Sequence, residues 1–67
     1  MKKTYDIQFN DNNTSDCKGF KQTLPYCIGY ICNHNKTNHS YFADYKGGTA
    51  SIVCNETNQV VFNTKVT

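Results

Sequence analysis

The segment LPYCIGYICNHN, residues 24–35, is the clearest indication of the fold of this 67-residue chain, because its apolar residues recur with the period of a helix. Thr23 stands in the N-cap position, and Pro25 falls in the first turn, where its missing N–H costs nothing. The residues NHNKTN that follow include types that tolerate the left-handed backbone found at many helix ends. The helix carries one apolar stripe, made of Leu24, Cys27, Ile28, Ile31 and Cys32.

Two strands are predicted before this helix. KTYDIQF alternates, with Tyr5, Ile7 and Phe9 on one face, which is typical of a half-buried strand. The turn-forming cluster NDNNTSD follows, and CKGFKQ, residues 17–22, then predicts a second strand that returns as a hairpin. Cys17 would lie at the edge of the loop.

Two further strands, TASIVCN and VVFNTKV, are predicted after the helix. The five residues NETNQ between them predict a hairpin loop with Asn58 at positive φ. Ile52 and Cys54 share one face of the first of these strands. The second strand would meet them with a face made of Val60, Phe62 and Val66.

The connector SYFADYKGG predicts one helical turn that starts from a Ser40 cap and closes at Gly47 and Gly48. The order along the chain is then β-β-α-β-β. The economical architecture is an α+β fold, in which a small antiparallel sheet of three to four strands carries one helix on one face. Residues 1–67 would form a single domain.

The net charge and the types of basic residue limit the classes of molecule that the protein is expected to bind. The net charge is +2, and every basic residue is a lysine. Arginine supplies the bidentate contacts to phosphate and guanine, so its absence argues against specific DNA reading and makes nucleic acid a secondary expectation. No apolar run is long enough to span a membrane, and the opening MKK is not followed by the apolar core of a signal peptide. We therefore expect a cytoplasmic protein that does not contact membranes.

The cysteines admit several interpretations. Cys27 and Cys32 have a C-x₄-C spacing, so a helix would rotate their side chains about 140° apart and separate their Cα atoms by about 8 Å. This spacing disfavours a shared zinc ion and a mutual disulfide. A long-range disulfide such as Cys17 with Cys54 stays open.

We favour reduced, buried cysteines at positions 27, 32 and 54, with no metal and no cofactor. A cluster of Cys32 with His34 and His39 would need a segment that is not helical. Cysteine nucleophiles also need a base held against the thiol, and no spacing enforces such a pair. We therefore expect no enzymatic activity.

Tyrosines mark the other side of the helix. Tyr26 and Tyr30 stand at i and i+4 with Gly29 between them, and no lysine or carboxylate occurs between Lys21 and Lys36. Tyrosine is enriched at binding hot spots. The predicted interaction surface is Tyr26, Gly29, Tyr30 and Asn33. The alternative is that the rings lie over the sheet edge and only their hydroxyls reach water.

A second aromatic group, Tyr41, Phe42, Tyr45 and Lys46, precedes the double glycine. Aromatic rings beside a lysine can stack on nucleobases or contact a protein. The alternative is a satellite cluster that closes the core.

The segments KKTYDIQF, GFKQTLPYCIGYI and YFADYKGGTASIVCNETNQVVFNTKV together resemble short uncharacterised proteins of low-GC Gram-positive bacteria and their phages. The resemblance implies a class of role, that of inhibitors that bind a host defence component, anti-CRISPR proteins among them. It assigns no residue a function.

We therefore expect a small non-catalytic module that binds a protein partner, or itself as a homodimer, and acts by steric blocking. One alternative is a nucleotide or nucleic-acid binder that uses the Tyr41–Lys46 loop. The other is a secreted, disulfide-stapled effector or toxin.

Overall fold

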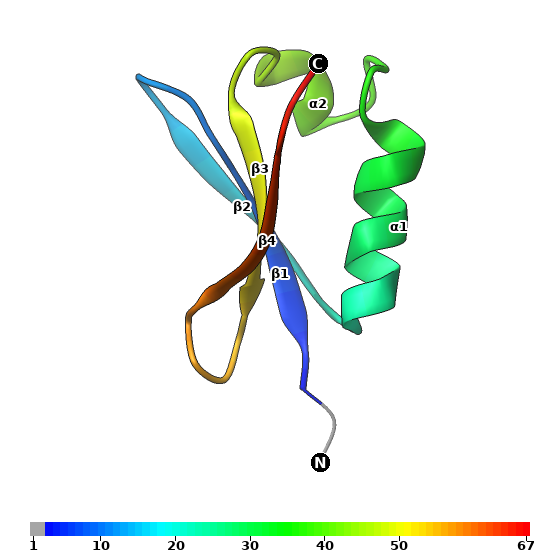
Figure 1. The fold of residues 1–67 in the computed structure, drawn as a ribbon. Helices are drawn as coiled ribbons and strands as arrows, with labels where there is room; N and C mark the ends of the chain where they lie inside the picture. The colour runs from blue at the N-terminus through cyan, green and yellow to red at the C-terminus, as the bar shows by residue number, and fades with distance from the viewer. Residues whose placement is uncertain (1–2) are drawn as a thin grey trace.

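The computed structural model describes residues 3–67 and confirms the α+β fold with the order β-β-α-β-β (Figure 1). The predicted helical turn is present between the main helix and the third strand. The elements are β1 (Tyr5–Asn10), β2 (Ser15–Gln22), α1 (Leu24–His34), α2 (Tyr41–Asp44), β3 (Thr49–Cys54) and β4 (Val60–Lys65). Among residues 3–67, no helix is long and apolar enough to cross a membrane.

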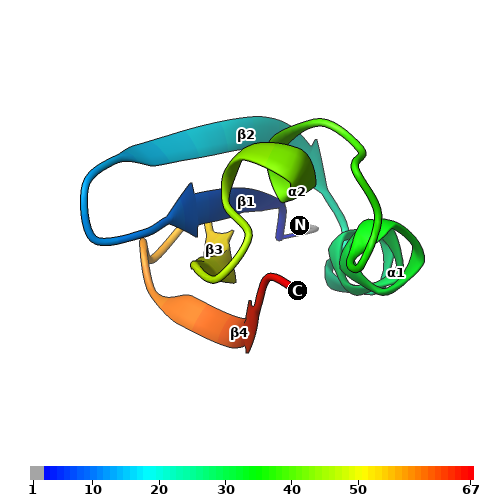
Figure 2. The ribbon, with the colours of Figure 1, turned by 90° about the horizontal axis from the view of Figure 1, so that it is seen from above.

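All four strands form one antiparallel sheet in the order β2-β1-β3-β4. Figure 2 shows α1 on one side of this sheet, and no helix of residues 3–67 covers the opposite side. The central strands are β1 and β3, with Ile7 opposite Ile52 and Phe9 opposite Ala50. The helix packs on β1, β2 and β3. The exposed residues on its other side are Pro25, Tyr26, Cys32 and Asn33.

The core lies between the sheet and α1. The alternation predicted for β1 is confirmed, since Ile7 and Phe9 are fully buried on the side that faces the helix. From α1, Cys27 and Ile31 enter the same core. The other core residues are Phe42, Tyr45, Ala50, Ile52 and Val66.

The ends of α1 follow the local sequence. The Thr23 hydroxyl accepts a hydrogen bond from the backbone N–H of Tyr26 at 3.3 Å, as expected of an N-cap. At the other end Asn35 is the C-cap, and Lys36 adopts the left-handed backbone with a φ of 68°. The β3–β4 loop is also as predicted, because Asn58 has a φ of 60°.

The connector folds over one end of the core. Phe42 and Tyr45 of this segment are buried, and the Phe42 ring meets Phe9 edge-on at a centroid distance of 4.9 Å. Ser40 occupies the N-cap position of α2, but its hydroxyl makes no capping bond and instead accepts from Lys18 Nζ at 3.2 Å. A Cβ on Gly48 would overlap the backbone carbonyl of Asn10, so the close approach of these two segments requires glycine.

Three side-chain predictions are wrong. Cys32 is exposed, because it lies about 100° around the helix from the buried Ile31. Val60 is 53% exposed, because β4 contains an extra residue that places Val60 opposite Val53 and turns it away from the helix side. Cys17 lies within β2 rather than at a loop edge.

Candidate functional site

A shallow groove of about 330 Å³ runs along the outer side of α1. It contains all four residues of the interaction surface predicted on the helix, together with one residue from the first turn and one from the last. The residues of this α1 groove are Pro25, Tyr26, Gly29, Tyr30, Asn33 and His34.

Helical spacing explains how the groove forms. Tyr26, Gly29, Tyr30 and Asn33 stand at i, i+3, i+4 and i+7, so they share one face of the helix. Gly29 lines the groove without a side chain, and the space above its backbone is open, since a Cβ at this position would meet no atom within 4 Å. Tyr26 is 50% exposed and Asn33 is exposed, so both side chains are free to contact another molecule.

Tyr30 is held differently from Tyr26. Its ring is half-buried and packs edge-on against Phe20 of β2 at a centroid distance of 4.7 Å, and it also contacts His34 at 4.6 Å. The Tyr30 ring therefore lies over the sheet edge, as the alternative predicted, but its hydroxyl does not reach water, and the ring forms a fixed wall of the groove. Tyr26 meets Phe20 at the longer centroid distance of 5.8 Å.

The Tyr30 hydroxyl is shielded from solvent and makes no hydrogen bond of standard geometry within residues 3–67. Burial raises the pKa of Tyr30, and the hydroxyl of Ser40 opposes part of this rise. The phenol is therefore neutral at physiological pH, so this wall of the groove adds no charge.

The loop after α1 folds back at the C-terminal end of the groove. The rings of His34 and His39 stack at a centroid distance of 4.0 Å with an interplanar angle of 16°. His39 also contacts Tyr30 edge-on at 6.0 Å. In the part of the chain that the structure describes, no three histidine, cysteine or acidic side chains gather as a metal site.

The second predicted group does not form one surface. Phe42 is fully buried and Tyr45 is 3% exposed, so neither ring can stack on a nucleobase. Tyr41 is half-buried, with Lys18 Nζ 5.4 Å from its ring centroid. Lys46 is exposed, and its ammonium donates to the carbonyl oxygens of Thr37 and Thr67 at 2.9 and 3.2 Å. Phe42 and Tyr45 therefore belong to an aromatic cluster that closes the core, which was the alternative prediction for this segment.

The cysteines lie apart. Cys27 and Cys54 are buried, Cys17 and Cys32 are exposed, and all four are free. Partial desolvation of the thiol, and secondarily the negative charge of Asp6, raises the pKa of Cys17, whose thiol lies 3.9 Å from the Asp6 carboxylate. This environment disfavours the thiolate that a cysteine nucleophile needs.

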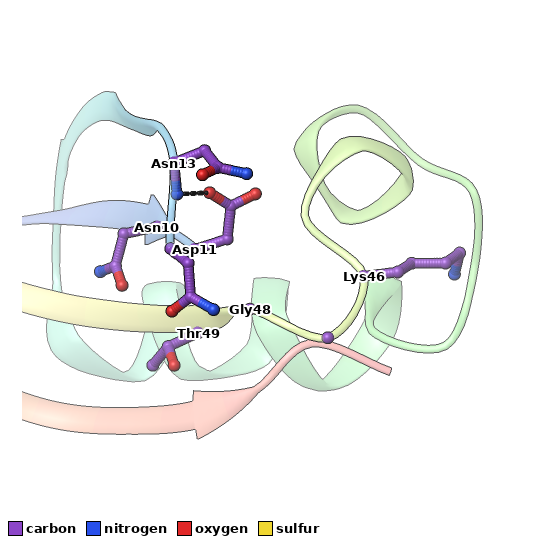
Figure 3. A pocket seen from close by; sticks show the side chains of 8 residues that line it. Asn10, Asp11, Asn13, Lys46, Gly48 and Thr49 are labelled. Carbon is purple, nitrogen blue, oxygen red and sulfur yellow. Dashed lines mark hydrogen bonds between the residues drawn. The ribbon is translucent and has the colours of Figure 1, made fainter.

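Sequence reasoning missed a polar cleft between the β1–β2 loop and the start of β3 (Figure 3). The Asp11 carboxylate accepts hydrogen bonds from the backbone N–H groups of Thr14 and Asn13, both at 2.8 Å, and these bonds lower the pKa of Asp11. Figure 3 shows Lys46 pointing away from Asp11 and Asn13. The Asp11 carboxylate thus stabilises its own turn, and the only sequence signal was the turn-forming cluster NDNNTSD.

No family model, curated protein or solved structure matches this chain.

Proposed function

We propose that the protein is a small, non-catalytic binding module that docks a protein partner on the α1 groove. The observation that carries the proposal is the groove itself, an uncovered aromatic notch above the backbone of Gly29 on a helix whose other side is buried. Binding there would act by steric blocking and would need no cofactor.

The lining suits a protein partner. Tyrosine offers a large, rigid contact area and a hydroxyl for hydrogen bonding, and it is enriched at binding hot spots. The groove contains no lysine and no carboxylate, so a partner would not have to desolvate such a charge. Its volume of about 330 Å³ is at the lower end of the range for drug-sized ligands, which favours one or two inserted side chains of a larger molecule.

The resemblance to phage-type proteins suggests which class of partner the groove would bind. We propose that the blocked partner is a component of a bacterial defence system, as it is for anti-CRISPR inhibitors. Expression of the chain in cells whose CRISPR immunity clears a targeted plasmid should restore plasmid maintenance. Maintenance that stays at the level of the empty vector would contradict this role.

A selection from a phage-displayed random peptide library tests the groove directly. Gly29→Leu should fill the notch without disturbing the fold, and Ala43→Leu places the same leucine side chain at an exposed helical position on α2. Peptides selected on the wild-type protein should lose binding to Gly29→Leu and keep it with Ala43→Leu. Equal binding to both variants would place the interaction elsewhere. Binding that collapses with added salt would favour a nucleic-acid or other polyanion site instead.

A further inference from the structure

Within residues 3–67, neither the backbone conformation nor close packing requires glycine at position 29. Gly47 has a φ of 88°, and a Cβ on Gly48 would overlap a backbone carbonyl, so the fold requires glycine at both positions. Gly29 has no positive φ, and a Cβ there meets no atom within 4 Å. A glycine in the middle of a helix is destabilising relative to alanine, so this residue weakens α1 without any gain inside the monomer.

The residues around Gly29 have the arrangement that receives another helix. In helix–helix packing, a side chain of one helix inserts into a hole formed by four residues of the facing helix. Tyr26, Gly29, Tyr30 and Asn33, at i, i+3, i+4 and i+7, form such a hole. A small residue at the contact lets two helix backbones approach closely.

The charges permit a second copy as the occupant, because two like-charged copies can meet at a face that carries no lysine or carboxylate. The chain has a net charge of +2, so many relative orientations of two copies would bring lysines together. The outer side of α1 carries no lysine or carboxylate between Lys21 and Lys36. Two copies can therefore meet at this face without opposing like charges.

We propose that α1 packs across α1 of a second copy about a twofold axis close to Gly29. The contact is isologous, so each copy presents the same hole and the same side chains. With the helices antiparallel, Tyr26 of one copy lies beside Asn33 of the other, where the phenol and the amide can exchange a hydrogen bond. This inference deepens the proposed function and rests on it, since it names the partner of the same groove.

The dimer should be weak. The helix has 11 residues, and one face of it offers less area than the roughly 800 Å² per partner of a standard protein interface. Association should therefore depend strongly on protein concentration. The measurement must extend into the high micromolar range.

Sedimentation equilibrium of the full chain, from low to high micromolar concentration, tests the proposal. The wild type should shift from monomer to dimer, and Gly29→Ala should raise the dissociation constant about tenfold or more because the added methyl groups keep the backbones apart. Gly29→Leu should abolish the dimer, and Ala43→Leu should associate like the wild type.

A second readout separates packing from folding. At the dilute end of the series, Gly29→Ala should melt at a higher temperature than the wild type, because alanine strengthens the helix. If Gly29 served only the fold of one chain, Gly29→Ala would not combine a more stable monomer with weaker association.

Two results would overturn the dimer. One is a wild type that stays monomeric at every concentration, and the other is wild-type association in both Gly29 variants. If the wild type is monomeric yet the library peptides still bind the groove, the proposed function stands and only self-pairing fails. If neither dimer nor peptide binding occurs, both proposals fail.

Discussion

The side chain of Asn35 pairs with the backbone of the chain at Lys65, where β4 ends. Its Nδ2 donates to the carbonyl oxygen of Lys65 at 2.9 Å, and its Oδ1 accepts from the N–H of Thr67 at 3.0 Å. The Asn35 side-chain amide thus makes the same pair of hydrogen bonds, one donated and one accepted, that a peptide group of a neighbouring strand would make. The C-cap of α1 thereby fixes the end of β4 and occupies backbone groups that an edge strand would otherwise leave open.

Asn35→Ala should lower the free energy of unfolding by about 1 kcal/mol, because two partly exposed hydrogen bonds are lost and β4 loses its attachment to α1. Urea unfolding followed by circular dichroism measures this change. Asn33→Ala is the matched control, since Asn33 is an exposed asparagine on the same helix and should change stability by less than about 0.5 kcal/mol. Equal losses in both variants would contradict the role given to Asn35.

Gly48→Ala should destabilise the fold by about 2 kcal/mol or more, because the new Cβ would overlap the carbonyl of Asn10 and force the backbone to shift. Gly29→Ala, measured on the dilute monomer, should instead stabilise it by about 0.5–1 kcal/mol. Thermal unfolding of the two variants measures both effects. If both variants changed the free energy of unfolding in the same direction, the space around one of the two glycines would differ from that in the structure.

Native thiol labelling should modify Cys17 and Cys32 and spare Cys27 and Cys54, because only the first two are exposed. Hydrogen bonds from the backbone of Thr57 and Glu56 lower the pKa of Cys54, but its burial should still slow the reagent. Intact-mass measurement after alkylation should count two labels in buffer and four in denaturant. Two or fewer labels in denaturant without reductant would indicate a disulfide.

The β1–β2 turn should weaken at acidic pH through Asp11. The backbone N–H groups of Thr14 and Asn13 lower its pKa below the ordinary 3.8, so the ionised carboxylate contributes stability above that pH. This contribution is lost as the pH falls through the lowered, folded-state pKa.

Asp11→Asn keeps an acceptor oxygen at the same position but cannot titrate. The wild type should therefore be more stable than this variant at pH 7, and the difference should vanish below the folded-state pKa of Asp11. Urea unfolding at a series of pH values measures this difference. A difference that is independent of pH would contradict the assignment.

The features that arise from neighbouring residues could be predicted from the amino-acid pattern alone. The apolar period and the Thr23 cap set α1, the alternation around Ile7 set β1, and Asn58 set the β3–β4 loop, because each depends on local backbone preference or on one buried face. The spacing of Tyr26, Gly29, Tyr30 and Asn33 also gave the α1 groove, since helical geometry alone places them on one face.

Which of these faces are exposed to solvent depends on how the strands and helices pack against one another. The extra residue in β4 exposes Val60, because the register of a strand depends on its partner as well as on its own pattern. Cys32 is exposed because the sheet covers only part of the apolar stripe. Phe42 and Tyr45 become core residues because the connector folds over Phe9, a contact between segments far apart in the sequence that no local preference specifies.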